Sequence, residues 1–297
     1  MSATLLVTGA SGQMGRRVVE LLLENHDGPI IAATRSPQNL ADLAARGVEV
    51  RYANFDEADS LVTAFAGVDR LLLISTDALG EPNKRLNQHV AAVKAAERAG
   101  VKHVVYTSLV NADDTPVIFA PDHAGTEQAL AASSLGWTVL RNNLYMDLLI
   151  QTVSQGYQMG SIYSAAGDGK TAYITREDCA RAAAAALAAP FEGTRILNIT
   201  GPQALSPAEI AGIASGITGK SLSYTFVPLE AVIQGMVGAG LPQPLAETFA
   251  SIDSAIAAGK MAEVSGAFEE LTGHAPTGAA DFLKAHEAAL TEAITAQ

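Results

Sequence analysis

Residues 5–15 read Leu5-Leu6-Val7-Thr8-Gly9-Ala10-Ser11-Gly12-Gln13-Met14-Gly15, an apolar run that passes directly into three glycines spaced three apart. The run is typical of a buried strand, and the segment after it has helical apolar periodicity. In this context the glycines permit a tight turn, a close approach of the backbone to a pyrophosphate and close helix–strand packing. We therefore predict a dinucleotide site at a helix N-terminus. The residues expected to contact the dinucleotide are Gly9, Ser11, Gly12, Gln13 and Met14.

The first half of the chain continues as short β-branched runs alternating with longer helical segments, which is typical of a parallel sheet covered by helices on both faces. The predicted strands are Thr4–Thr8, Ile30–Thr34, Val48–Tyr52, Arg70–Ile74, His103–Thr107 and Trp137–Arg141. The predicted helices lie around Gln13–Glu24, Pro37–Ala45, Glu57–Phe65, Lys84–Ala99 and Gly125–Ser133. The fold class is therefore α/β, a Rossmann-type doubly wound parallel sheet of six strands.

The alternation breaks after Arg141, and helices then dominate. Ser206-Pro207-Ala208-Glu209 has the spacing of a capping box and predicts a helix from Pro207. Further helices are expected in Leu245–Ala258 and Ala279–Ile294, with short strands at Arg195–Thr200 and Leu222–Val227. We expect a Rossmann domain over 1–150 and a smaller, mainly helical substrate region over 151–297, interleaved with the first. The substrate is expected between the two, outside the carboxyl ends of the strands.

The end of the second strand indicates which dinucleotide is bound. Enzymes that choose NAD usually carry Asp or Glu about 20 residues beyond the glycine turn. Here that place reads Thr34-Arg35-Ser36. A guanidinium suits a 2′-phosphate through charge-assisted, bidentate hydrogen bonds. Arg35 therefore predicts NADP(H), although a solvated loop cation is the alternative.

Composition narrows the remaining classes of protein. The 297 residues carry 19 Lys and Arg against 31 Asp and Glu, a net charge of −12, and no basic run that would bind nucleic acid or an anionic membrane. The single cysteine, Cys179, cannot pair within the chain, and no metal site is expected. No apolar stretch reaches the ~18 residues of a membrane span and no signal peptide is recognised. We expect a cytoplasmic protein, a monomer or a homodimer, whose partner is a small molecule.

Several segments together carry a resemblance to a known family. Besides the glycine turn and Arg35 they are Leu72–Ser75, Tyr106–Leu109, Leu140–Tyr145, Ala165–Lys170 and Thr175–Asp178. The chain resembles the NmrA-like group of atypical short-chain dehydrogenases, and within it bacterial NADPH-dependent quinone oxidoreductases and triphenylmethane dye reductases. The resemblance implies that Ser75–Asp77 and Val139–Asn142 border the nicotinamide half of the cofactor, with Ser75, Thr76 and Asn142 in contact. It also implies that Asn142–Asp147 lines the substrate cleft.

The residues that are missing say most about the chemistry. Short-chain dehydrogenases commonly use a Tyr-x-x-x-Lys pair, in which Tyr protonates the alkoxide and Lys lowers the Tyr pKa. No Tyr here has Lys four residues later, and His123 and Glu127 occupy that spacing instead. A ketone reductase or sugar epimerase is therefore disfavoured. Acceptors that need little acid help remain, such as a quinone or a cationic dye.

The resulting hypothesis is hydride transfer from NADPH to a quinone-like or other activated acceptor, with Asn142 and His123 as candidate catalytic residues. Asn142 would orient the acceptor or the nicotinamide, and His123 has an intrinsic pKa suited to protonating a product. The candidate substrate residues are Ser108, Tyr145 and Met146, although a turn role for Ser108 and a core role for the other two stay open. Two other functions also stay open: a non-catalytic NADP(H)-sensing regulator, and a reductase of activated C=C, C=N or C=O bonds.

Overall fold

The computed structural model describes residues 2–295, and a seven-stranded sheet of order β3-β2-β1-β4-β5-β6-β8 is its largest element. The strands are β1 (Leu5–Val7), β2 (Ile30–Thr34), β3 (Glu49–Tyr52), β4 (Arg70–Leu73), β5 (His103–Leu109), β6 (Gly136–Asn142) and β8 (Thr194–Ile199). All neighbouring pairs from β3 to β6 are parallel. Every residue of β1, β2 and β4 is buried, as expected for strands covered on both faces. The α/β Rossmann class is confirmed.

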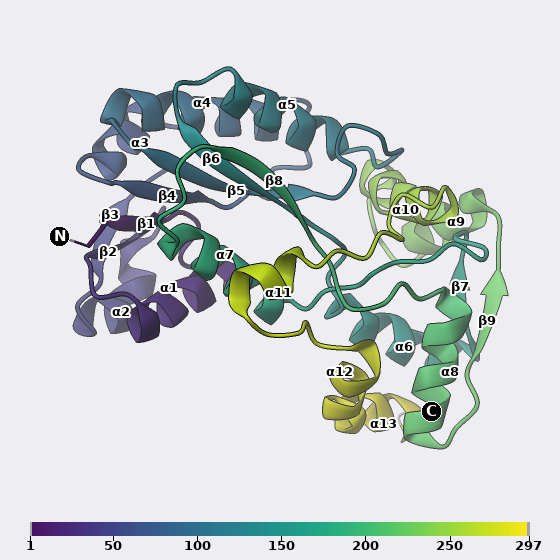
Figure 1. The fold of residues 1–297 in the computed structure, drawn as a ribbon. Helices are drawn as coiled ribbons and strands as arrows, with labels where there is room; N and C mark the ends of the chain where they lie inside the picture. The colour runs from purple at the N-terminus through teal and green to yellow at the C-terminus, as the bar shows by residue number, and fades with distance from the viewer. Residues whose placement is uncertain (1, 296–297) are drawn as a thin grey trace. The chain divides into compact units, whose positions relative to one another are not determined.

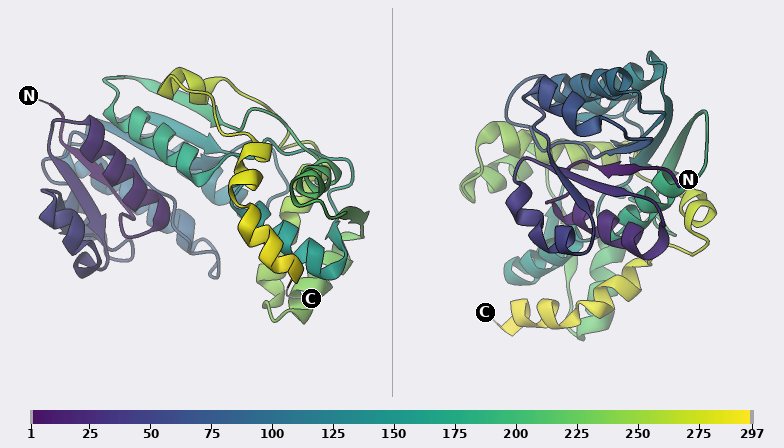
Figure 2. Two further views of the ribbon diagram at one scale, coloured as in Figure 1. Left: turned by 90° about the horizontal axis from the view of Figure 1, so that it is seen from below. Right: turned by 90° about the vertical axis from the view of Figure 1, so that its left-hand side faces the viewer.

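Helices cover both faces of this sheet (Figure 1). They are α1 (Gln13–Asn25), the 3-10 helix Pro37–Leu40, α2 (Ala41–Ala45), α3 (Ala58–Phe65), α4 (Lys84–Ala99), α5 (Ala120–Ala131) and α7 (Arg176–Ala188). Helices α3, α4 and α5 lie on one face, and α1 and α7 lie on the other (Figures 1 and 2). The sheet is therefore doubly wound, as its sequence pattern predicts.

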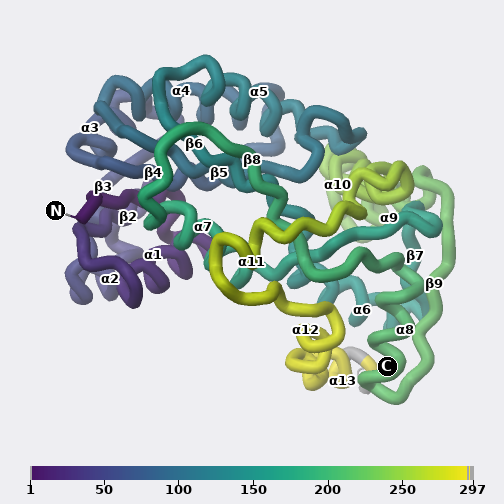
Figure 3. Tube along the Cα trace, viewed as in Figure 1, coloured from purple at the N-terminus to yellow at the C-terminus, as the bar shows by residue number. Residues whose placement is uncertain are grey.

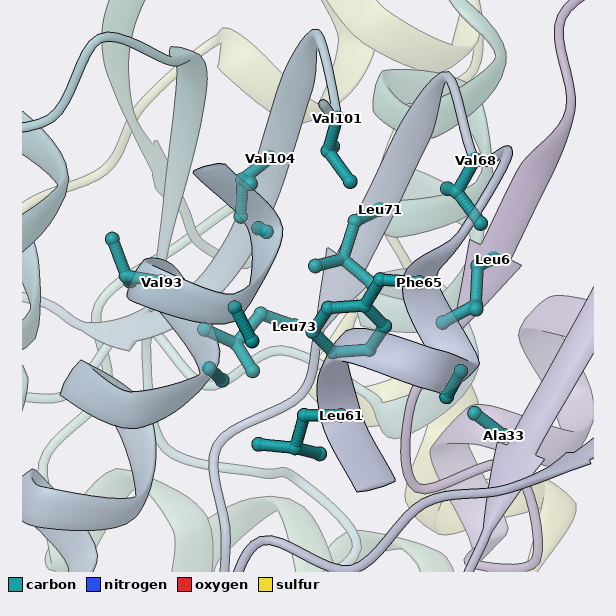
Figure 4. Close-up of a cluster of buried hydrophobic side chains, with 14 of the residues drawn as sticks. Leu6, Ala33, Leu61, Phe65, Val68, Leu71, Leu73, Val93, Val101 and Val104 are labelled. Atoms are coloured by element: carbon teal, nitrogen blue, oxygen red, sulfur yellow. The ribbon is translucent and has the colours of Figure 1, made fainter. Parts of the chain in front are cut away.

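A continuous apolar layer joins the sheet to α3 and α4 (Figure 4). Leu61 and Phe65 of α3 and Val93 of α4 face Leu71 and Leu73 of β4, and all five side chains are buried. Burying one such side chain contributes about 2 kcal/mol. This layer fixes α3 and α4 against one face of the sheet.

The strand order reverses beside β1, because β2 and β3 follow on one side of it and β4, β5 and β6 on the other. In open α/β sheets, ligands bind outside the carboxyl ends of the strands at such a reversal. The glycine turn after β1 and the segment after β4 both begin there. Residues that the sequence predicts to contact a dinucleotide therefore follow β1 and β4 at this edge of the sheet.

The chain divides into two compact units and passes between them several times (Figure 3). Unit 1 consists of residues 1–112, 121–142 and 177–198, and unit 2 of residues 113–120, 143–176 and 199–297. Unit 1 contains the sheet. Unit 2 is mainly helical and has its own apolar core, to which Met146, Val153, Ile210, Phe282 and Leu290 belong.

Unit 2 contains the helices and the short parallel sheet of the second half. These elements are α6 (Leu148–Met159), β7 (Ser161–Ser164), α8 (Pro207–Thr218), β9 (Ser223–Phe226), α9 (Leu229–Gly238), α10 (Gln243–Ala257), α11 (Ala267–Thr272), α12 (Ala279–Ala285) and α13 (Glu287–Thr295). The capping box is confirmed: Glu209 N donates to Ser206 Oγ and Ser206 N donates to Glu209 Oε2. The helix begins at Pro207, as its spacing predicts.

Two expectations about elements were wrong. The sheet has seven strands, because the segment expected as a short strand of the second region, Arg195–Thr200, forms β8 beside β6. This long-range pairing leaves no local signal in the sequence. The single helix expected over Ala279–Ile294 is two helices, α12 and α13, with a break at His286. The apolar periodicity continues through the break and therefore does not mark it.

Arg70, at the start of β4, supports the C-terminal end of α7. Its side chain donates to the carbonyl oxygens of Leu187 (Nε, 2.7 Å), Phe191 (Nη1, 3.0 Å) and Ala186 (Nη2, 3.2 Å). Arg70 is buried, so Arg70→Met would leave these carbonyls without their donors. We expect a loss of about 3 kcal/mol in the free energy of unfolding, measured by urea denaturation. The exposed Arg46 is the control, and an Arg46→Met loss as large would contradict the assignment.

Asp253 of α10 gives unit 2 a pH-dependent stability. Burial raises the pKa of Asp253, and the hydrogen bond that Ala165 N donates to its Oδ2 at 2.7 Å opposes the rise. Because the folded pKa lies above the unfolded one, ionising Asp253 lowers stability as the pH rises. Asp253→Asn keeps an acceptor for Ala165. At pH 7 we expect Asp253→Asn to unfold at a higher urea concentration than the wild type. Below about pH 4, where Asp253 is protonated, the two proteins should unfold at the same urea concentration. The exposed Asp27 offers the control Asp27→Asn, which should change neither value.

Candidate active site

The glycine turn between β1 and α1 has the geometry of a phosphate cradle. Gly9 has a φ of +61°, which favours glycine. A Cβ on Gly15 would lie 2.4 Å from Gly9 O and 2.8 Å from Gly9 C, so the close approach of helix to turn requires glycine there. Gly12 is the N-cap residue of α1 and has no side chain to accept a hydrogen bond from the first turn. Residues 11–13 are exposed. The helix N-terminus is therefore left to an external anion such as a pyrophosphate.

The end of β2 lies against this turn. Ser11 Oγ is 2.9 Å from Thr34 Oγ1, and Ser36 N donates to the same Thr34 oxygen at 3.1 Å. Arg35 is exposed, and it forms no ion pair within residues 2–295. A guanidinium held beside the glycine turn and not committed to a carboxylate fits a 2′-phosphate. The donor set thus fits NADP(H).

The segment after β4 is held by the strands and helix beside it. Ser75 N donates to Thr107 Oγ1 at 2.9 Å, and Thr76 N donates to His89 Nε2, also at 2.9 Å. Since His89 Nε2 accepts, its proton lies on Nδ1, which is 3.0 Å from Thr126 Oγ1. Burial lowers the pKa of His89 to about 3, so the ring is neutral at physiological pH.

Sequence reasoning missed His89. It occupies an inward position of α4, three residues after Leu86 and four before Val93, and it is fully buried. A polar side chain at an apolar position of an amphipathic helix was the available signal. His89 connects Thr76 to Thr126 of α5, and so supports one of the residues that the sequence assigns to the cofactor.

His123 lies inside unit 1 with 4% of its surface exposed, and its Nδ1 is 2.9 Å from Tyr106 Oη. Burial, with Arg85 and His89 nearby, lowers its pKa well below the ordinary value. The expectation of a histidine with its intrinsic pKa was therefore wrong, because the apolar surroundings disfavour the charged ring. His123 is a neutral imidazole at physiological pH. Its role as a proton donor stays a prediction.

Ser108, Glu127 and Arg141 form a buried polar group on one face of the sheet. Ser108 Oγ donates to Glu127 Oε1 at 2.6 Å. Arg141 donates to the same carboxylate twice, from Nε to Oε1 at 3.0 Å and from Nη2 to Oε2 at 2.6 Å. The place where a Tyr-x-x-x-Lys pair would carry its lysine is thus occupied by a carboxylate that forms an ion pair with the end of β6.

Asn142 is the last residue of β6 and is 4% exposed. Neither its Oδ1 nor its Nδ2 has a hydrogen-bond partner among residues 2–295. The register pairs Asn142 with Leu109 and pairs Arg141 with Ser108, so the Asn142 side chain faces the side of the sheet opposite to that of Ser108. A buried amide without partners costs about 1–3 kcal/mol per group unless a ligand supplies the bonds. This amide is the strongest indication of a ligand contact outside the glycine turn.

Tyr145 and Met146 belong to unit 2. Met146 is 1% exposed in the unit 2 core, and its N donates to Ile174 O at 2.8 Å, which matches the core role left open for it. Tyr145 is half-buried, with the Arg176 guanidinium carbon 5.0 Å from its ring centroid. Contacts of these two residues with an acceptor stay a prediction.

Metal-ligand groups and membrane-spanning helices are absent from residues 2–295. These residues contain no group of three or more His, Cys, Asp or Glu side chains placed to hold a metal ion. None of their helices combines the length and the apolar character needed to cross a membrane.

Comparison with known proteins places this geometry in a family. The profile of the NmrA-like family matches residues 1–278. Quinone oxidoreductase 2 of Escherichia coli (strain K12) is 34% identical over 278 residues, which cover 93% of this chain and 96% of that protein. Because the alignment covers 93% of this chain, it includes residues of both units.

Two solved structures share the fold over nearly the full chain. The structure of an NADPH-dependent quinone oxidoreductase from Escherichia coli complexed with NADPH has a TM-score of 0.89 and 33% identity, covering 95% of this chain and 99% of that one. The structure of triphenylmethane reductase from Citrobacter sp. complexed with NADP(H) has a TM-score of 0.87 and 34% identity, covering 97% and 99%. The resemblance stated from the sequence is confirmed. The chain belongs to the NmrA-like family.

Proposed function

We propose that this protein is an NADPH-dependent oxidoreductase that transfers hydride from the nicotinamide to a quinone-like small molecule. The observation that carries the proposal is the glycine cradle at the N-terminus of α1, which has no side-chain cap, with Arg35 beside it and forming no ion pair with any carboxylate of residues 2–295. The similarity to an NADPH-dependent quinone oxidoreductase and a triphenylmethane reductase, both solved with this cofactor, supports it.

The residues of unit 1 account for binding and orientation. The backbone of the glycine turn would hold the pyrophosphate and Arg35 the 2′-phosphate, while Ser75 and Thr76 would border the nicotinamide. Asn142 would use its amide to orient the nicotinamide or the acceptor, and Ser108 would contact the acceptor. Bound NADPH supplies the hydride. The protein thereby contributes position and orientation more than acid–base power.

The choice of acceptor follows from the buried groups. Burial keeps the His123 ring neutral, so His123 is a weak proton donor, whereas a ketone reductase needs a readily transferred proton. A quinone that gains hydride becomes a resonance-stabilised anion, which takes its proton from water. An acceptor of this kind therefore suits the site better than a simple ketone.

The test follows NADPH absorbance with purified protein and a panel of quinones, cationic dyes, enones and simple ketones. We expect turnover with quinones or dyes and little with ketones. Tight NADPH binding without turnover of any acceptor would instead favour an NADP(H)-sensing regulator. Turnover confined to ketones would contradict the proposed acceptor class.

Asn142 gives a prediction that separates function from stability. Asn142→Leu replaces two unpartnered buried polar groups by methyl groups in a side chain of the same branched shape, so the ligand-free protein should gain about 1–2 kcal/mol in the free energy of unfolding. The same change should lower kcat roughly 10- to 100-fold while NADPH binding changes little. Urea denaturation and steady-state kinetics measure the two effects. A variant that is less stable and fully active would contradict the role.

A further inference from the structure

The buried group formed by Ser108, Glu127 and Arg141 determines how one hydroxyl can meet a ligand. The Arg141 and Glu127 side chains are only 12% and 10% exposed, and two hydrogen bonds fix the carboxylate plane. The short bond from Ser108 Oγ then fixes the direction of the serine proton. All three residues lie in unit 1: Ser108 and Arg141 are near the carboxyl ends of β5 and β6, and Glu127 belongs to α5.

We propose that Glu127 is a positioning residue that makes Ser108 a hydrogen-bond acceptor toward the substrate, and thereby favours acceptors that carry an N–H or O–H group beside the reducible carbonyl. This inference rests on the proposed function, since it assumes that Ser108 contacts the substrate. It adds a specificity determinant to that function.

The Ser108 hydroxyl has one proton and two lone pairs. A charged carboxylate 2.6 Å away is a stronger acceptor than the neutral carbonyl of a quinone, so the serine proton stays on the Glu127 side. Only lone pairs then remain for a ligand at the edge of the sheet. Ser108 cannot donate to a substrate carbonyl without breaking its bond to Glu127.

Arg141 keeps this arrangement from reversing. Because its Nε and Nη2 both donate to Glu127, the carboxylate cannot rotate away from Ser108 without losing an ion pair in a buried place. An oxyanion would therefore find its donor on the opposite side of the sheet, where the Asn142 amide lies without a partner among residues 2–295.

The test compares 2-amino-1,4-naphthoquinone, which carries N–H donors beside a carbonyl, with 2-methyl-1,4-naphthoquinone, which has none. The measured quantity is the kcat/KM of the amino compound divided by that of the methyl compound. The two quinones differ in reduction potential, but this difference is the same for every variant, so a change in the ratio reports on the protein. Ser108→Ala should lower this ratio about tenfold, mainly through KM of the amino compound, and Ser108→Thr should restore it. Glu127→Gln should lower it to a similar extent, since it frees the serine proton.

A double-mutant cycle separates positioning from general damage. Adding Glu127→Gln to Ser108→Ala should leave the ratio unchanged, because Glu127 acts through the serine hydroxyl. An unchanged ratio in Ser108→Ala overturns the inference even if Glu127→Gln fails to fold. The inference is also overturned if Glu127→Gln lowers the ratio equally in the wild type and in Ser108→Ala. If the wild type reduces neither quinone, both the proposed function and the inference are contradicted. If it reduces both quinones and Ser108→Ala has no effect on the ratio, only the inference is contradicted.

Discussion

Gly15→Ala is expected to weaken NADPH binding about 100-fold or more. The added Cβ would lie 2.4 Å from Gly9 O, 2.8 Å from Gly9 C and 3.0 Å from Ala10 Cα, and all three atoms are backbone. The clash can be relieved only by moving the first turn of α1 away from the glycine turn. A displacement of about 1 Å at a preorganised site can cost 10²-fold. Fluorescence titration of NADPH measures the loss.

A matched control separates the loss of binding from loss of fold. Gly216 lies within α8 in unit 2, and a Cβ there meets no atom within 4 Å. Gly216→Ala should leave NADPH binding unchanged and raise the free energy of unfolding by about 0.5–1 kcal/mol. Tight NADPH binding by a folded Gly15→Ala variant would show that the cradle is not the phosphate site.

Arg35→Asp is expected to weaken NADPH binding roughly 100- to 1,000-fold and NADH binding less than about tenfold. The change removes a charge-assisted bond to the 2′-phosphate and places a carboxylate against that dianion, whereas NADH has only a hydroxyl there. Arg35 is exposed and forms no ion pair within residues 2–295, so the fold loses nothing. Dissociation constants of both cofactors, measured at one ionic strength, give the ratio.

The control for a general charge effect is Arg46→Asp. Arg46 is exposed and precedes β3, so it lies toward the amino edge of the sheet, away from the carboxyl end where Arg35 follows β2. Its substitution changes the net charge by the same amount and should leave the preference for NADPH intact. Equal losses for NADPH and NADH in Arg35→Asp would contradict the assignment of Arg35.

Elements that are encoded by a local sequence pattern could be predicted well. The predicted Ile30–Thr34 coincides with β2, and the capping box at Ser206 begins α8 at Pro207 as expected. Both depend on neighbours in sequence: an apolar run between turns, and a side chain that bonds a backbone group three residues away. The place of β8 depends on pairing with β6 across more than fifty residues, which no local pattern encodes.

The sequence alone determined the glycine turn and the missing Tyr-x-x-x-Lys pair, and it predicted NADP(H) from Arg35, because each is a matter of residue type at a short spacing. Only the tertiary structure decided the protonation of His123, the unpartnered amide of Asn142 and the bond between Ser108 and Glu127. These properties depend on burial and on partners from other elements. A pKa or an unsatisfied hydrogen bond belongs to a residue's surroundings, and folding alone creates them.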